Sequence, residues 1–220
     1  MSKPETSELP DLQQLVLAYA RPADRGAWHA FFALDTQLAS LVRKATEPLL
    51  GQVRLAWWRD RLQEDVEIWP RGNPVLSSIA NSWASYAAGL APLVDGWEHL
   101  LAEPPIGPSD IEGFAAGRGQ ALAALSEVAG ADEYREAALL AGTRWALADL
   151  AANSTAEDEQ AAILNAASHY GLEPVRLSRA MRPLAILDGL AIRSIRAQGA
   201  PLFAGRRAAL AALRLGMFGR

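Results

Sequence analysis

The sequence predicts an all-α fold, a single-domain helical bundle, and three observations support this prediction. Alanine is abundant and β-branched residues are sparse, which favours helices over strands. Apolar residues recur at i, i+3, i+4 and i+7 spacing along several segments. Helix start signals and breaks containing proline or glycine separate these segments. With 220 residues, half of them hydrophobic, the chain is long enough to bury one sizeable core.

The helices are expected within one domain over residues 10–220, after a disordered lead over residues 1–9. Proline in a first turn marks the third helix, and Asn73 followed by Pro74 marks the fourth. Ser109 with Glu112, and Ser154 with Glu157, have the spacing of capping boxes. The expected helices cover residues 11–20, 24–44, 48–68 and 75–90, a stretch starting at 109, and residues 131–152, 154–170, 182–198 and 204–216.

Composition excludes several kinds of site. Cysteine is absent, which excludes disulfides, thiolate nucleophiles and Cys-ligated metals. The three histidines, His29, His99 and His169, show no metal-ligand spacing, so no metal site is predicted. Residues 1–8 are polar and contain no apolar segment of a secretory signal. No apolar run is long enough to span a bilayer, so a cytoplasmic protein is expected, soluble or peripheral to the inner membrane.

Charge is distributed unevenly along the chain. Residues 174–220 contain nine arginines and one acid, Asp188, which gives them a charge of +8. Because the whole chain carries −4, the remainder carries −12. This asymmetry suggests a polyanionic surface as a partner, and no nucleic-acid partner is expected. The alternative is that these arginines only keep the last two helices soluble.

The last two predicted helices combine this basic charge with apolar stripes. The first stripe lies within residues 182–198 and the second within residues 204–220, and arginines such as Arg193, Arg206 and Arg214 flank them. Such helices can lie on an anionic membrane. The stripes consist of Leu184, Leu187, Leu190, Ala191, Ile195, Leu210, Leu213, Met217 and Phe218.

A lone carboxylate, Asp35, lies within the apolar stripe of the second predicted helix. A buried carboxylate needs a partner or must be protonated. Asp35 therefore either lines a cavity or pairs with an arginine such as Arg54 of the next helix. Residues 57–60, Trp-Trp-Arg-Asp, could form a cavity wall and an anion site; alternatively, one tryptophan packs inside while the arginines and the aspartate form pairs on the helix surface. Arg54 and Trp58 share one face of that helix and are the residues expected to face the cavity.

A second candidate carboxylate, Asp149, lies on a later helix. Asp149 and Asn153 are four residues apart, so they are expected to point the same way. Asp149 has the same two interpretations as Asp35, a cavity position or a structural ion pair.

Residues 28–60 resemble the amino-terminal region of the squalene/phytoene synthase family. An aromatic-rich helix is followed by Glu47-Pro48 and then by Gln-x-Arg-Leu-x-Trp-Trp-Arg-Asp over residues 52–60. The resemblance covers most of the chain more weakly. It implies the isoprenoid-synthase fold, a helical bundle around a central cavity. In active members, two acidic motifs on facing helices hold Mg²⁺ ions that bind prenyl diphosphates. Mg²⁺ needs carboxylate oxygens in octahedral geometry, and the substrate phosphates complete its shell.

The sequence departs from the family pattern at both motifs. The first should fall near Ala39, Ser40 and Arg43, where there is no acid, and the second retains only Asp149, with Asn153 at the other acidic position. The chain is more similar to a branch without these motifs, which includes an assembly factor for respiratory complex I.

This resemblance implies a degenerate, non-catalytic protein that acts in assembly at a membrane surface or binds an isoprenoid. Its partners would be isoprenoid or membrane lipids, or respiratory-complex subunits. The alternative is an active prenyl transferase with an altered Mg²⁺ site; otherwise no cofactor is expected. Candidate catalytic residues are Asp35 and Asp149, and candidate substrate-binding residues are Arg54, Trp58 and Asn153.

Overall fold

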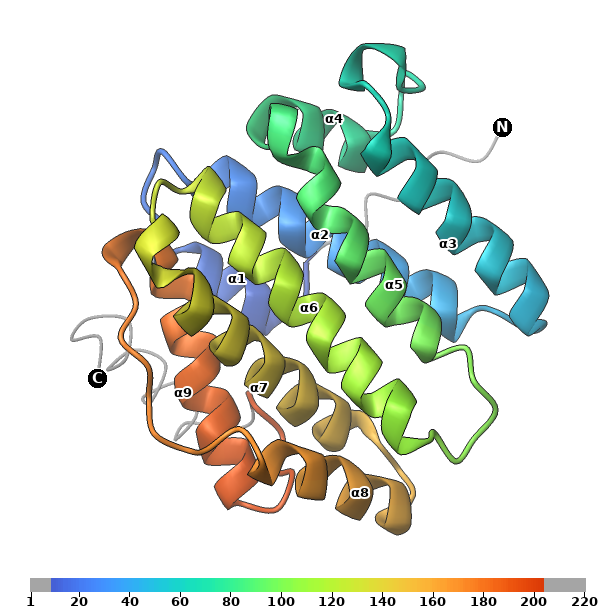
Figure 1. Cartoon of the computed structure of the whole chain (residues 1–220), viewed down its shortest axis with the longest axis vertical. Coiled ribbons are helices and arrows are strands. Elements are labelled where there is room, and N and C mark those ends of the chain that lie inside the picture. Colours follow the sequence, from blue (N-terminus) through green and yellow to red (C-terminus); the bar gives the residue numbers. More distant parts are fainter. Residues whose placement is uncertain (1–8, 204–220) are drawn as a thin grey trace.

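The computed structural model describes residues 9–203, and these residues confirm the all-α prediction, since they contain helices and no strand. Figure 1 shows the helices in chain order. The α-helices are α1 (Asp11–Leu17), α2 (Arg25–Arg43), α3 (Pro48–Gln63), α4 (Pro74–Ser82), α5 (Ala91–His99), α6 (Pro108–Val128), α7 (Arg135–Asn153), α8 (Glu157–Ser168) and α9 (Arg182–Arg196). Four 3₁₀ helices cover Val66–Ile68, Ala84–Leu90, Asp132–Tyr134 and Arg179–Met181.

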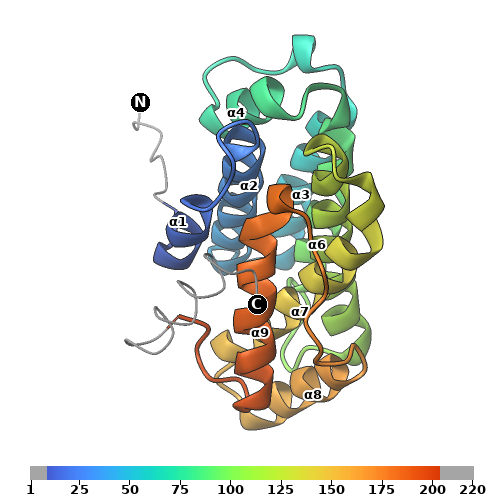
Figure 2. The ribbon, with the colours of Figure 1, turned by 90° about the vertical axis from the view of Figure 1, so that its left-hand side faces the viewer.

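The helices form a bundle in which α6 and α7 are central. In space, α3 packs on α5, α5 on α6, α6 on α7, and α7 on α9 (Figure 1). Helix α2 packs against α3, α4 and α5, and α1 contacts both α2 and α9. Helices α4 and α8 lie at opposite ends of the bundle (Figure 2). This arrangement places Asp35 of α2 near the interior faces of α5, α6 and α7.

Most predicted helices are present, but three details differ. The helix predicted over residues 75–90 ends at Ser82, because the buried Trp83 indole donates to Ala27 O at 3.0 Å and Ala84 adopts a φ of 41°. The third helix ends at Gln63 instead of residue 68. Helix α6 starts at Pro108 and α8 starts at Glu157, each without a side-chain cap, so the capping boxes predicted at Ser109 and Ser154 are both wrong.

Aromatic rings fill the centre of the bundle. Trp28, Phe31 and Phe32 of α2 pack against one another, and both phenylalanines contact Trp145 of α7. The Phe32 and Trp145 rings meet edge to face, with centroids 6.2 Å apart. All four side chains are buried. Aromatic packing of this kind contributes specific geometry in addition to buried area.

Two glycine contacts bring three helices unusually close together. Gly117 of α6 faces Gly96 of α5, and a Cβ on Gly117 would lie 2.7 Å from the Gly96 Cα. Gly119 of α6 faces Gly142 of α7, where a Cβ on Gly142 would lie 3.0 Å from the Gly119 Cα. Gly117 and Gly119 are therefore packing positions, at which a side chain would push the neighbouring helix away. These contacts hold α5 and α7 close to α6 on either side of Arg118.

Helix α9 does not present the apolar surface that was predicted for it. Its stripe, from Leu184 to Ile195, is buried in the core against α7 and α1. The prediction that this stripe lies on a membrane is therefore wrong. The helix predicted over residues 204–216, and the lead before Leu9, lie outside the described residues. Among residues 9–203, no helix is long and apolar enough to cross a membrane.

Candidate functional site

Asp35 is the buried centre of the candidate site. Its side chain is 3% exposed on α2. The Trp97 indole of α5 donates to Asp35 Oδ1 at 2.8 Å. Arg118 Nη2 of α6 donates to both carboxylate oxygens, each at 3.1 Å. Three helices therefore supply a carboxylate, an indole donor and a guanidinium to one point of the core.

Arg118 also reaches the second predicted carboxylate. Its Nη1 donates to Asp149 Oδ2 of α7 at 2.9 Å. The guanidinium carbon lies 4.4 Å from the Trp145 ring centroid, 4.8 Å from that of Phe114 and 5.4 Å from that of Trp97. Arg118 is 2% exposed. One cation thus bridges Asp35 and Asp149 and is enclosed by three aromatic rings, an arrangement that stabilises a buried guanidinium.

The electrostatics of this cluster follow from its burial. Desolvation raises the pKa of Asp35 above its ordinary value, and the charge of Arg118 and the hydrogen bond from Trp97 only partly oppose the rise. Burial lowers the pKa of Arg118, but the two carboxylates reverse this effect and leave it above its ordinary value. Arg118 therefore remains a cation, as expected for a guanidinium.

Asp149 and Asn153, two of the residues predicted from the sequence, lie together on α7. Asp149 is one-third exposed at the edge of the cluster. Asn153 is exposed, but its amide donates to Asp149 O at 2.8 Å and to Asp149 Oδ1 at 3.3 Å. Asp149 and Asn153 therefore do point the same way. Of the three charged side chains of the cluster, Asp149 is the one partly exposed to solvent, since Asp35 and Arg118 are buried.

Arg54 does not join this cluster. It is exposed on α3, so the prediction that it pairs with Asp35 and faces inward is wrong. Its neighbour Trp58 is buried and meets Trp57 edge to face, with centroids 5.1 Å apart. Residues three and four positions apart share one face of a helix. The buried face of α3 therefore contains Leu55, Trp58 and Leu62, and Arg54 lies outside it.

A second buried ion pair lies on the other side of α7. Arg144 donates through Nε and Nη2 to the two oxygens of Asp188 on α9, both at 2.8 Å. Its Nη1 donates to Gly171 O at 3.2 Å and Glu173 O at 3.0 Å. Burial raises the pKa of Asp188, and Arg144 opposes the rise. Arg144 thus ties α7 to α9 and to the connection after α8.

Arg118, Arg144 and Trp97 were missed at the sequence level. A signal for both arginines exists in the sequence, because each has apolar residues three and four positions away on its helix. Arg118 is preceded by Phe114 and followed by Leu122 at four-residue spacing. This pattern places an arginine on a buried face, where it needs carboxylate partners.

The donor set of this cluster does not fit a Mg²⁺ ion. Mg²⁺ requires free carboxylate oxygens in octahedral geometry. Asp35 and Asp149 instead accept hydrogen bonds from Arg118, whose cation occupies the position between them. Within residues 9–203, no three His, Asp or Glu side chains come together in a way that could hold a metal ion.

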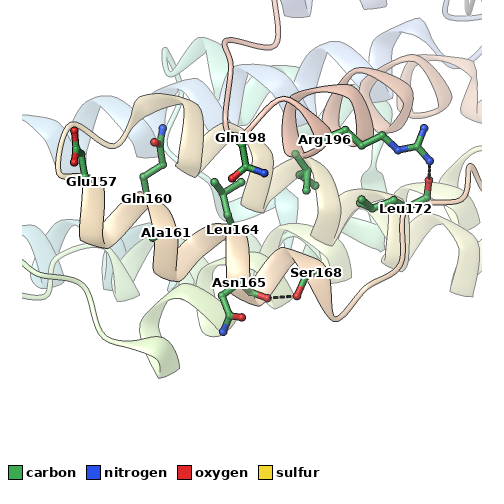
Figure 3. A pocket seen from close by; sticks show the side chains of 10 residues that line it. Glu157, Gln160, Ala161, Leu164, Asn165, Ser168, Leu172, Arg196 and Gln198 are labelled. Atoms are coloured by element: carbon green, nitrogen blue, oxygen red, sulfur yellow. Dashed lines mark hydrogen bonds between the residues drawn. The ribbon is translucent and has the colours of Figure 1, made fainter.

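A surface hollow of about 490 Å³ lies between α8 and the end of α9, and Figure 3 shows its lining. Leu164, Leu172 and Ile195 contribute its apolar part. Arg196 Nη2 donates to Leu172 O at 2.9 Å, so this cation is already engaged by the backbone. The hollow contains none of the candidate residues and lies apart from the buried Asp35 cluster.

Comparisons with known proteins add no relative: no family model, no curated protein and no solved structure matches this chain.

Proposed function

We propose that this protein is a non-catalytic relative of the squalene/phytoene synthases that serves in assembly at a membrane surface, such as that of a respiratory complex. One observation carries the loss of catalysis: the Arg118 guanidinium lies between Asp35 and Asp149. Prenyl-diphosphate chemistry would need Mg²⁺ between such carboxylates, to bind the substrate and stabilise the departing diphosphate. Here an internal cation takes that place.

The guanidinium of Arg118 is not free to take the place of the metal in catalysis. Both of its terminal nitrogens already donate to carboxylates, and its faces contact Trp97, Phe114 and Trp145. A diphosphate could reach it only by displacing these partners from a buried position.

The membrane part of the proposal is supported by the sequence after residue 203. Residues 204–220 contain four arginines and no acid. Basic segments of this kind are attracted to anionic lipid headgroups, at about 1 kcal/mol for each basic residue near the surface. Because the rest of the chain is acidic, this basic segment is the part that an anionic membrane would attract.

A diphosphate-release assay tests the loss of catalysis. The purified protein is incubated with farnesyl or geranylgeranyl diphosphate and Mg²⁺, and free diphosphate is measured over time. We expect no release above that of a protein-free sample. Mg²⁺-dependent release that is abolished by Asp149→Asn would instead support the prenyl transferase alternative. Asp149 suits this control because it lies at the partly exposed edge of the cluster.

A further inference from the structure

Helix α3 carries an apolar face that points away from the protein. Four large apolar side chains on it are exposed: Leu49 at 68%, Leu50 at 49%, Val53 at 61% and Trp57 at 39%. Leu49, Val53 and Trp57 follow one another at four-residue spacing, so they form a ridge along the helix. We call these four residues the α3 stripe. Figure 1 shows α3 at the edge of the bundle.

The fold of α3 does not depend on this stripe. The opposite face of the helix buries Leu55, Trp58 and Leu62 in the core. On the side facing α5, Arg59 forms ion pairs with Asp95 and Glu98. Because apolar residues occupy both the inward and the outward faces, packing within residues 9–203 does not explain the outward ones.

Cations flank the amino-terminal part of the stripe. Arg43 and Lys44 are exposed at the end of α2, directly before α3, and Arg54 is exposed beside Leu50 and Val53. Against these three cations, residues 43–54 contain one acid, Glu47, which leaves a local charge of +2 in a chain whose net charge is −4. The excess ends beyond Trp57, because Asp60 is exposed there and Arg59 is paired with Asp95 and Glu98. An apolar ridge with a tryptophan and flanking cations matches an anionic lipid surface.

We propose that the α3 stripe inserts into the headgroup region of an anionic membrane, with Arg43, Lys44 and Arg54 contacting lipid phosphates. The stripe is about 12 Å long at the rise of an α-helix. Its four partly exposed side chains offer a few hundred Å², whereas a stable protein interface takes about 800 Å² from each partner. The size and the charge of this face therefore fit a lipid surface better than a second copy of the chain.

This inference rests on the membrane association in the proposed function and locates it on α3, but it is independent of the loss of catalysis. A result in the diphosphate-release assay therefore leaves it unaffected. It also differs from attachment through residues 204–220, and the two sites can be separated by substitution.

Tryptophan fluorescence gives a direct readout. Six of the seven tryptophans are at most 9% exposed, and Trp57 alone is well exposed. With vesicles of brominated phosphatidylcholine and phosphatidylglycerol, we expect the full chain to bind and its fluorescence to be quenched. Trp57→Phe should remove most of that quenching while most of the binding remains. Vesicles without the anionic lipid should bind at least tenfold more weakly.

A charge placed in the stripe should prevent insertion. We expect Val53→Glu to weaken vesicle binding, measured by flotation, at least tenfold. Leu139→Glu is the matched control, since Leu139 of α7 is as exposed as Trp57 but lies on another helix. This control should bind as the unmodified protein does.

Three results would overturn the proposal. The first is full binding by Val53→Glu together with loss of binding when Arg206, Arg207 and Arg214 are changed to glutamate. The second is quenching that persists in Trp57→Phe. The third is the absence of vesicle binding together with a dimer in light scattering that Val53→Glu dissociates, which would identify a second copy as the occupant.

Discussion

Replacing Arg118 with methionine tests the buried cluster through stability and pH together. The guanidinium is 2% exposed and supplies two hydrogen bonds to Asp35 and one to Asp149. Methionine is of similar length and apolar, so it keeps contact with the surrounding rings but leaves Asp35 with only the Trp97 donor. Removing one partner of a buried ion pair costs about 3–5 kcal/mol, which is the destabilisation expected near neutral pH.

The pH dependence has a definite sign. A carboxyl group whose pKa is raised on folding contributes stability at low pH, and this contribution is lost as the pH rises through its folded-state pKa. Burial already raises the pKa of Asp35, while Arg118 opposes the rise. In Arg118→Met the opposition is gone, so the pKa of Asp35 rises further. The cost of the substitution should therefore be small at acidic pH and grow toward neutral pH.

Urea unfolding followed by circular dichroism, from about pH 4 to about pH 8, measures this difference within the range where a perturbed aspartate titrates. The double variant Arg118→Met/Asp35→Asn is the control, because asparagine cannot ionise. It should lack the pH-dependent part of the loss. A destabilisation below about 1 kcal/mol at every pH would refute the reasoning, since even a single ordinary hydrogen bond contributes about that much. So would a loss that shrinks as the pH rises.

Two further substitutions probe the helix contact beside this cluster and the second buried ion pair. Gly117→Ala would place a Cβ 2.3 Å from Pro92 O, so α5 must shift. We expect the free energy of unfolding, measured with urea, to fall by about 1–3 kcal/mol or more. The control Gly107→Ala should change it very little, because the nearest atom to its added Cβ is 3.4 Å away. Arg144→Met removes both hydrogen bonds to Asp188 and those to the connection between α8 and α9. It should cost about 3–5 kcal/mol and speed amide exchange in that connection, and unchanged exchange there would contradict the role assigned to Arg144.

The positions of the helices could be predicted because their causes are local. Asn73 caps α4 by accepting from the amides of Val75 and Leu76, and proline occupies an early position of α3, as expected. The early end of α4 could not be predicted in this way. It depends on the hydrogen bond from Trp83 to Ala27, which is 56 residues away in the chain.

The candidate site was predicted only in part, for the same reason. Periodicity places Asp35 and Asp149 on inward faces, but it does not show which helix lies opposite each one. The partner of Asp35 proved to be Arg118, 83 residues away, and not Arg54 of the adjacent helix. The glycines beside Arg118 bring α5 and α7 within reach, an effect that only the packed bundle reveals.

Apolar stripes were open to two interpretations in the same way. The stripe of α9 is amphipathic, and amphipathicity shows that a face will be covered but not what covers it. In the structure the rest of the protein covers α9, whereas the outward face of α3 stays exposed. The exposed face of α3 could not be predicted from periodicity, because apolar residues on both sides of this helix weaken the periodic pattern.

Anomalous diffraction from crystals grown with Mn²⁺ and farnesyl diphosphate tests the central claim most directly. Mn²⁺ prefers the same oxygen ligands as Mg²⁺ and can be located by its anomalous scattering. We predict that Arg118 still bridges Asp35 and Asp149, with no anomalous peak between the two carboxylates. A Mn²⁺ peak between them, with Arg118 displaced, would contradict the account.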